Sequence, residues 1–229
     1  MCGIIALFGE EVDISSYLLN HRGPDDYRTS KIGKCRMDFY RLAINDLTDA
    51  GMQPFIQNKA MLVCNGEIYN HREFRLGNEK SNSDCEILIP MIQTFGIMKT
   101  VEMINGDFAF VYTDGKRIMA ARDPVGVRPL FYTRYDDNSI AFASEVKALT
   151  SLGAEIHIFP PGHIYDSYID DFVCYHTGYW HVNKHVNGGM TKQIRESFEK
   201  AVHLRLDNTE RDIGFLLSGG LDSSLIASI

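Results

Sequence analysis

The chain opens with the sequence MCGIIALFG, residues 1–9, in which a cysteine stands directly behind the initiator methionine and ahead of a short apolar run. Under one interpretation, Cys2 to Phe8 form a buried strand and the thiol is a small hydrophobic group within it. Under the other, Met1 is removed and Cys2 becomes the working N-terminus of an enzyme. This opening stretch allows both interpretations, and the rest of the chain decides between them.

The bulk properties of the chain exclude several classes of protein. Its 229 residues are 45% hydrophobic and 23% charged, an ordinary globular composition for one domain, or for one domain with part of a second. The net charge of −7 without a basic block argues against nucleic-acid binding. The five scattered cysteines predict neither a disulfide framework nor a metal site. Because no stretch resembles a signal peptide or a membrane span, we expect a cytoplasmic protein without membrane contact.

Most of the chain is predicted to form short strands separated by turns, because runs rich in β-branched and aromatic residues alternate with turn formers. These runs are residues 2–9, 36–44, 60–66, 106–114, 116–123, 129–137, 139–144 and 162–166. The pair Asp114-Gly115 predicts a hairpin loop. Apolar periodicity predicts a helix at residues 83–94, with Ser83 or Asp84 as its cap, and another at residues 191–206. This mixture favours an α+β sandwich of sheets covered by helices.

The character of the sequence changes near the C-terminus. The polar, glycine-ended stretch VNKHVNGG at residues 182–189 is predicted to be a linker. The final segment, IGFLLSGGLDSSLIASI at residues 213–229, predicts a strand, a glycine turn and a helix. That succession is the opening of an α/β unit.

Four further features each have an ordinary structural explanation when they are taken alone. HRGPDD at residues 21–26 is typical of a turn. CNGEIYNH at residues 64–71 ends a predicted strand at an Asn-Gly pair, which is usual in a type I′ turn. SDCE at residues 83–86 is typical of a helix start. Arg41 stands in an otherwise apolar strand, where a guanidinium is seldom buried without a carboxylate partner.

Their combination and order are more specific than any one of them. MCGI, HRGPD, RLAI, NGEIYNH, SDCE and RDPVGVRPLFY together resemble the glutaminase domain of glutamine-dependent asparagine synthetases. These are class II glutamine amidotransferases and N-terminal-nucleophile (Ntn) hydrolases. The resemblance covers Cys2 to about Trp180, including ASEVKAL and FPPGHIY, and continues through SGGLDSS at residues 218–224. It implies an αββα four-layer Ntn-hydrolase sandwich at residues 2–182. At residues 183–229 it implies the first fragment of an α/β ATP-pyrophosphatase (PP-loop) domain.

The resemblance gives Cys2 a mechanism. The α-amine of an N-terminal nucleophile serves as its own base, and about a tenth of such an amine is neutral at pH 7. Removal of Met1 is therefore obligatory. The tetrahedral oxyanion needs aimed donors, and the family pattern implies the Asn65 side-chain amide and the Gly66 backbone N–H. Glycine suits that position because the backbone must come close to the substrate. His21 is predicted to shape the pocket loop.

The same pattern implies how L-glutamine is held. Arg41 would bind its α-carboxylate, and Glu67 and Asp84 its α-ammonium. The backbone of four residues would wall the pocket: Leu42, Ala43, Ile44 and Asn45. Ammonia would leave, and water would hydrolyse the resulting thioester on Cys2. This hydrolysis needs no cofactor and no metal.

SGGLDSS resembles the pyrophosphate-binding loop of ATP pyrophosphatases, because N–H groups at a glycine turn that leads into a helix bind anions. The implied, incomplete ATP site consists of Leu217, Ser218, Gly219, Gly220, Leu221, Asp222 and Ser223. One βα unit cannot enclose a nucleotide, so ATP and Mg²⁺ would act only if the synthetase half were supplied. We therefore do not expect asparagine synthesis by this chain alone.

Three interpretations follow from the short synthetase segment. In the first, the chain is the glutaminase half of a split enzyme, with a separate synthetase polypeptide or a homodimer as partner. In the second, it is a truncated product that hydrolyses glutamine without coupling. In the third, it is a degenerate, non-catalytic relic, and the intact set of site residues argues against this. The amide acceptor could also be a carboxylate other than aspartate.

Overall fold

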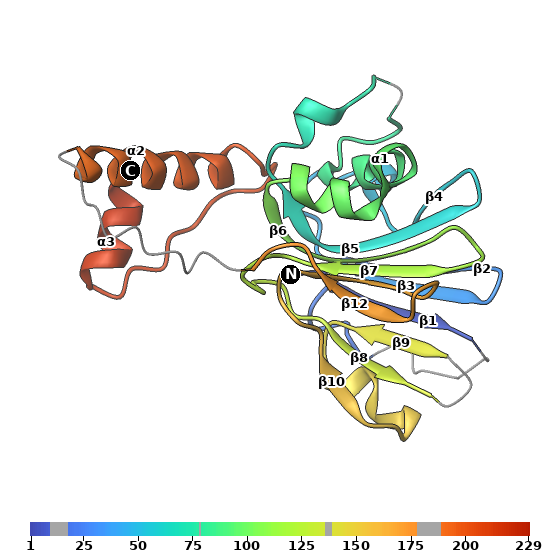
Figure 1. Ribbon diagram of the computed structural model, residues 1–229. Coiled ribbons are helices and arrows are strands. Elements are labelled where there is room, and N and C mark those ends of the chain that lie inside the picture. The colour runs from blue at the N-terminus through green and yellow to red at the C-terminus, as the bar shows by residue number, and fades with distance from the viewer. Residues whose placement is uncertain (10–17, 78, 136–138, 178–188) are drawn as a thin grey trace. The chain divides into compact units, whose positions relative to one another are not determined.

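The computed structural model describes residues 1–9, 18–77, 79–135, 139–177 and 189–229. The chain divides into two compact units, Met1–Gly178 and Tyr179–Ile229 (Figure 1). Residues 182–188 of the predicted linker lie outside the described residues, so the boundary between residues 182 and 183 stays a prediction. Among the described helices, none is long and apolar enough to cross a membrane.

The first unit contains two six-stranded antiparallel sheets. The first sheet has the order β10 (Ile156–Ile158), β8 (Phe131–Arg134), β9 (Ile140–Ala143), β1 (Gly3–Phe8), β3 (Cys35–Arg41) and β2 (Asp26–Ile32). The second has the order β12 (Asp171–Cys174), β11 (His163–Asp166), β7 (Ile118–Arg122), β6 (Gly106–Thr113), β5 (Ala60–Ile68) and β4 (Phe55–Gln57). Strand β1 is therefore an inner strand of the first sheet, and β5 is an inner strand of the second.

The period-2 alternation of apolar side chains explains why the sheets stack. In β1, Ile4 and Ala6 belong to the core that also takes residues from β5, β6 and β7 of the other sheet. Ile5 and Leu7 point to the opposite face and pack with Leu19. Cys2 has the same parity as Ile4, and it packs against the edge of the core between the sheets.

Short helices cover the outer faces of the sheets. The 3₁₀ turn η3 (Asp84–Ile87) continues into α1 (Leu88–Met103), which packs on β5 and β6 and kinks at Gly96, where φ is 77° (Figure 1). On the first sheet, η4 (Val146–Ala148) and η5 (Thr150–Leu152) contribute to the outer cluster. Two further 3₁₀ turns are η1 (Asp49–Gly51) and η2 (His71–Phe74). The α+β sandwich is confirmed. Among the described residues, the outer layer over the first sheet consists of 3₁₀ turns instead of longer helices.

Each strand segment predicted before residue 167 contains an observed strand, and the predicted Asp114-Gly115 hairpin joins β6 to β7. Four strands were not predicted: β2, β4, β10 and β12. All four lie at the edges of their sheets, where one side faces solvent and the sequence is correspondingly more polar. The periodicity that reveals an inner strand is weakest there.

Two local predictions were wrong. The strand expected to end at Asn65-Gly66 continues to Ile68, and Gly66 pairs with Phe108 instead of forming a type I′ turn. Neither Ser83 nor Asp84 caps a helix through its side chain, because the Asp84 carboxylate instead accepts the N–H of Ile68 at the end of β5, at 2.6 Å.

The second unit contains α2 (Met190–Leu206), as predicted, and α3 (Leu221–Ser228). The predicted strand at residues 213–217 is not formed. A strand needs a neighbour for its N–H and C=O groups, and the described residues of this unit contain no other strand. Apolar side chains of this segment, Phe215 and Leu216 among them, are exposed.

The HRGPD turn packs so closely on β3 that Gly23 is required. A Cβ atom at Gly23 would lie 2.1 Å from the carbonyl oxygen of Tyr40, which is backbone and cannot move aside. We expect Gly23→Ala to lower the free energy of unfolding by about 1–3 kcal/mol in urea denaturation. Gly214→Ala is the matched control, because its Cβ meets no atom within 4 Å, and it should change stability by less than about 0.5 kcal/mol. Equal stability of the two variants would contradict this packing.

Candidate active site

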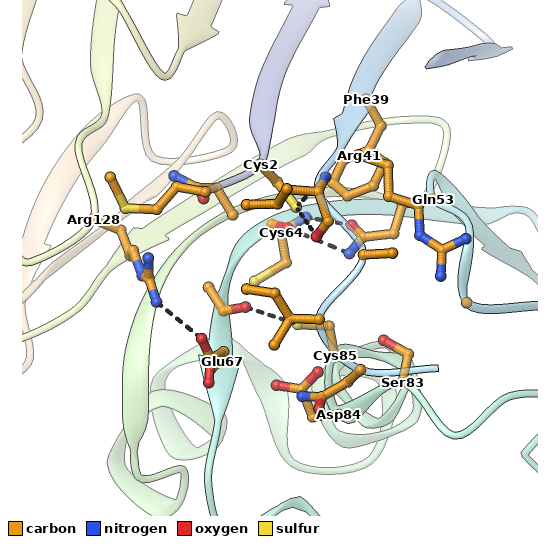
Figure 2. Close-up of a pocket in the computed structure, with 18 residues that line it drawn as sticks. Cys2, Phe39, Arg41, Gln53, Cys64, Glu67, Ser83, Asp84, Cys85 and Arg128 are labelled. Carbon is orange, nitrogen blue, oxygen red and sulfur yellow. Dashed lines mark hydrogen bonds and ion pairs between the residues drawn. The ribbon is translucent and has the colours of Figure 1, made fainter. Parts of the chain in front are cut away.

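A cavity lies where the N-terminus of β1 meets β3 and β5 (Figure 2). The volume that the centre of a water molecule can occupy in it is about 40 Å³. It is lined by every residue predicted for the glutaminase site: Cys2, Arg41, Leu42, Ala43, Ile44, Asn45, Asn65, Gly66, Glu67 and Asp84. The sequence motifs did not assign the other lining residues, which are Met1, Phe39, Gly51, Gln53, Cys64, Ser83, Cys85 and Arg128. Segments far apart in the sequence therefore converge on one site, while the roles of the individual residues stay predictions.

Cys2 is held at the rim of the sandwich by the backbone that follows β3. The Leu42 N–H donates to Cys2 Sγ at 3.4 Å, and Sγ lies 3.5 Å from the Leu42 carbonyl oxygen. Burial raises the pKa of the Cys2 thiol, and the Leu42 hydrogen bond and the charge of Arg128 offset this only in part. With Met1 attached, the thiol is therefore protonated at neutral pH, and the α-amine near it belongs to Met1 instead of to Cys2 itself.

The HRGPD and ASEVKAL motifs meet behind the N-terminus and fix the Cys2–Gly3 peptide group. Arg22 Nε donates to the Cys2 carbonyl oxygen at 3.0 Å, and Arg22 Nη1 pairs with Glu145 at 3.1 Å. Glu145 also lies 2.9 Å from His21 Nε2. His21 therefore braces the turn that carries Arg22, and it does not line the cavity.

Asn65 lies in the middle of β5 and is 1% exposed. Its side-chain Nδ2 is buried and has no hydrogen-bond partner among the described residues, and the same holds for Asn45 Nδ2. Buried amide donors are nearly always paired, since an unpaired one costs about 1–3 kcal/mol. Two unpaired donors on one cavity indicate a site built for a ligand with acceptor oxygens.

Gly66 continues β5 beside the cavity. A Cβ atom there would lie 2.5 Å from the Asp107 carbonyl oxygen, so glycine is required by the neighbouring strand β6. This differs from the predicted reason, a close approach to substrate. The Gln53 side chain pairs with both the N–H and the C=O of Cys64, at 2.6 and 3.3 Å, on the edge of β5 opposite β6. The Gly66 N–H, two residues further along, faces that same edge.

Arg41 ends β3 and is 6% exposed. Its guanidinium donates to two backbone carbonyls, that of Thr48 at 2.7 Å and that of Asp46, and it forms no ion pair with a carboxylate in the part of the chain that is described. Gly51 leaves the space for this guanidinium, because a Cβ there would lie 2.8 Å from Arg41 Nη2. A nearly buried cation without a counter-ion suits an anionic ligand such as a carboxylate.

The acidic side of the cavity comes from Glu67 on β5 and Asp84 in η3. Asp84 is 3% exposed and is oriented by the Ile68 N–H. Glu67 Oε1 lies 3.4 Å from Arg128 Nη2. The cavity thus carries the Arg41 guanidinium together with the carboxylates of Glu67 and Asp84, and Arg128 lies beside Glu67 (Figure 2). Groups of both charges suit a ligand that carries both, such as a free α-amino acid.

Arg128 belongs to the RDPVGVRP motif, which was quoted for the resemblance but assigned no role. Arg22 and Glu145 were missed in the same way, and Gln53 was missed because it lies outside every motif quoted for the resemblance. Two of these four, Arg22 and Glu145, act on the backbone that positions Cys2, directly or through a partner. The sequence feature that could have identified Arg22 and Glu145 is their position in the HRGPD and ASEVKAL motifs.

The SGGLDSS loop lies in the second unit. Gly219 has a φ of 81°, and the loop leads into α3 as predicted. The Gly220 N–H donates to Ser218 Oγ and the Ser218 N–H to Ser223 Oγ, each at 3.3 Å. Backbone donors that would face a pyrophosphate are thus directed at the loop's own hydroxyls, and the ATP site stays a prediction.

The stacked antiparallel sheets, with a cysteine at the start of an inner strand, define the N-terminal-nucleophile hydrolase class. Residues 1–190 match the family model described as a glutamine amidotransferase domain, and residues 193–229 match the one described as asparagine synthase. The chain belongs to the glutamine amidotransferase domain family.

Curated relatives cover the whole chain. Asparagine synthetase (glutamine-hydrolyzing) 2 of Oryza sativa subsp. japonica is 38% identical over 248 residues, and asparagine synthetase (glutamine-hydrolyzing) 1 of Saccharomyces cerevisiae is 40% identical over 252. The match covers 100% of this chain and 41% and 43% of those relatives, so the chain spans less than half of their length.

The solved structure of glutamine phosphoribosylpyrophosphate (PRPP) amidotransferase from B. subtilis, complexed with ADP and GMP, shares the fold. It matches with a TM-score of 0.65 and 23% identity, over 77% of this chain and 50% of its own. At this identity the likeness concerns the fold alone.

Asp46 anchors the loop that carries the acceptors for Arg41. Its carboxylate accepts from the Thr48 hydroxyl at 2.5 Å and from the Asn82 N–H at 2.7 Å. Burial alone would raise the pKa of Asp46, but these hydrogen bonds outweigh it and lower the pKa below its usual value. A carboxyl whose pKa is lowered by folding stabilises the protein above its unfolded pKa, near 3.9, and that stabilisation is lost as the pH falls through the folded pKa.

We therefore expect Asp46→Asn to lower the free energy of unfolding by about 1.5–3 kcal/mol at pH 7. The difference from the parent chain should shrink in urea denaturation at pH 3. Asp49→Asn is the matched control, since the Asp49 side chain is 81% exposed and contributes little. A deficit in Asp46→Asn that is the same at both pH values would contradict the assignment.

Proposed function

We propose that this chain hydrolyses the side-chain amide of L-glutamine through Cys2, after removal of Met1, and releases ammonia and glutamate. The observation that carries the proposal is the placement of Cys2 Sγ on the same cavity as the unpartnered Asn65 amide. The family supports it, as do the relatives, which are glutamine-hydrolysing asparagine synthetases.

The first step is the attack of the Cys2 sulfur on the amide carbon. The Cys2 α-amine, freed by removal of Met1, accepts the thiol proton and later passes it to the leaving nitrogen. The negative charge that develops on the amide oxygen is stabilised by Asn65 Nδ2, which has no partner among the described residues, and by the Gly66 N–H, which faces the edge of β5 opposite β6. Because the Asn65 amide is already buried and unpaired, little reorganisation accompanies this step.

In the second step ammonia leaves, and a γ-glutamyl thioester remains on Cys2. Water attacks the thioester carbon, the carbon–sulfur bond breaks, and glutamate and the free thiol are regenerated. The same oxyanion donors serve this step. Selectivity for a free amino acid follows from Arg41, which binds the α-carboxylate, and from Glu67 and Asp84, which bind the α-ammonium on the same carbon.

We further propose that the ammonia serves ATP-dependent asparagine formation from aspartate. The match of residues 193–229 to the asparagine synthase family supports this acceptor. The remaining synthetase machinery, with ATP and Mg²⁺, would come from chain beyond these residues, from a separate polypeptide or from a homodimer. A different carboxylate acceptor is the alternative. A free nucleophilic thiol favours a reducing compartment, which supports a cytoplasmic location.

The test of the glutaminase is glutamate release from L-glutamine, with intact mass spectrometry to confirm that Met1 is absent. We expect release by the processed chain, none above background by Cys2→Ala, and none by a chain that retains Met1. Chelation by EDTA should leave the rate unchanged, since no step uses a metal. A folded, processed chain without glutamate release would refute the proposal.

The oxyanion role of Asn65 predicts a separate effect. Asn65→Ala should lower kcat about 10²–10³-fold with little change in KM, because the lost donor acts in the transition state. Asn65→Asp keeps the shape but replaces the donor with a carboxylate, and it should be impaired at least as strongly. Steady-state kinetics in which either variant mainly raises KM would assign Asn65 to substrate binding instead.

A further inference from the structure

Arg128 lines the cavity, and the proposed mechanism does not use it. Its side chain is 11% exposed, and arginine is seldom buried to this extent. Arg128 Nη2 lies 3.4 Å from Glu67 Oε1, and its Nε is buried without a hydrogen-bond partner in the described part of the chain. A buried N–H donor without a hydrogen bond lowers the stability of the fold, and this cost suggests that Arg128 has a functional role.

The backbone before Arg128 is a loop folded around one carboxylate. Asp123 accepts four consecutive backbone N–H groups, those of Val125, Gly126, Val127 and Arg128, at 2.6–3.1 Å. The loop thus has little freedom, and it fixes the Cα of Arg128 from which the side chain reaches the cavity.

Arg122 fixes the same loop from the other side. Its guanidinium donates to the carbonyls of Arg128, Phe159 and Gly126, at 2.6–2.9 Å. Arg122 and Asp123 do not line the cavity. Two buried charged residues therefore act together to hold one guanidinium at the site.

The guanidinium that results points toward Glu67, on the cavity that Cys2 also lines (Figure 2). The titratable and charged groups that share the cavity with Cys2, or contact its backbone, come from every element packed around it: Arg22, Arg41, Cys64, Glu67, Asp84, Cys85 and Arg128. Arg22 contacts the Cys2 backbone and pairs with Glu145, but it does not line the cavity. Of the two arginines that line it, Arg41 donates to backbone carbonyls, and Arg128 has a buried donor without a partner among the described residues.

We propose that Arg128 is a positioning residue of the glutaminase reaction, whose fixed positive charge favours the neutral amine and the thiolate of Cys2 once Met1 is removed. This rests on the proposed function. A nearby cation disfavours a protonated amine and favours a thiolate, so both groups shift toward the reactive form. The shift matters here because burial raises the pKa of the Cys2 thiol. Glu67 acts in the opposite sense and limits the effect.

The experiment measures the pH dependence of Cys2 alkylation by iodoacetamide in the processed chain, read from the mass of the N-terminal peptide. Since this readout needs no glutamine, it tests Arg128 whether or not the chain is a glutaminase. We expect the midpoint in Arg128→Met to move to higher pH by about one unit, which is a roughly tenfold slower reaction on the acid limb. Arg128→Lys keeps the charge, and it should retain the parent midpoint.

Two more variants keep the result interpretable. Glu67→Gln removes the opposing charge and should move the midpoint to lower pH. Lys116→Met removes one exposed cation in the β6–β7 hairpin, at the other end of β6, and should leave the midpoint unchanged. If Arg128→Met does not fold, as judged by its melting, the unchanged midpoint expected for Arg128→Lys and the lower midpoint expected for Glu67→Gln still decide the matter.

The kinetic counterpart is the pH profile of kcat/KM for glutamine, whose acid limb should move with the alkylation midpoint. Parent chain without glutaminase activity but with the expected alkylation shift would refute the proposed function and leave the role of Arg128 standing. An unchanged alkylation midpoint in folded Arg128→Met, or in Glu67→Gln, would overturn the inference about Arg128. A rise in KM alone would reduce Arg128 to a partner that orients Glu67.

Discussion

The register of β1 between β3 and β9 is the constraint on which the whole site depends. Gly3 pairs with Tyr40 and Ile5 with Ala143, which places Cys2 one residue before the ladder and beside Leu42. A shift of one residue would turn every side chain of the strand to the other face, exposing apolar residues of two cores and turning Cys2 away from the cavity. The apolar contacts that stabilise the sandwich are therefore the contacts that aim the nucleophile.

Cys2 lies on the same face of the chain as Ile4 and Ala6, which pack in the core between the sheets. The reactive centre therefore lies where the two sheets face each other. One sheet contributes Cys2 and Arg41, and the other contributes Asn65 and Glu67. Neither sheet alone carries both the nucleophile and the oxyanion donors. Catalytic geometry thus depends on sheet packing, and the unpaired buried amides show that stability has been given up at this place.

The sequence predicted the inner strands and the cavity residues better than the edge strands and the residues that hold the cavity residues in place. Inner strands such as β6 carry continuous apolar runs, whereas the edge strand β2 alternates too weakly to stand out. The Asn65-Gly66 pair predicted a turn, but these residues lie within strand β5. Glycine is needed at residue 66 because the neighbouring strand leaves no room for a Cβ atom. The predicted strand at 213–217 lacked a pairing partner, and the role of Arg128 depends on a loop whose folding around Asp123 has no periodic signal.

The position of β1 also sets an order of events during synthesis. The Met1–Cys2 bond lies against the cavity, and the Met1 side chain is about half exposed, so an aminopeptidase reaches this bond most easily while β1 is still unpaired. Its two partners, β3 and β9, end at Arg41 and Ala143, so a ribosome takes a few seconds, about 2–7 s, to complete the first after making β1 and roughly 10 s to complete the second. The nascent chain therefore has a time window for maturation. A molecule that folds before trimming would stay a dormant precursor, its nucleophile complete in every atom except the amine that activates it.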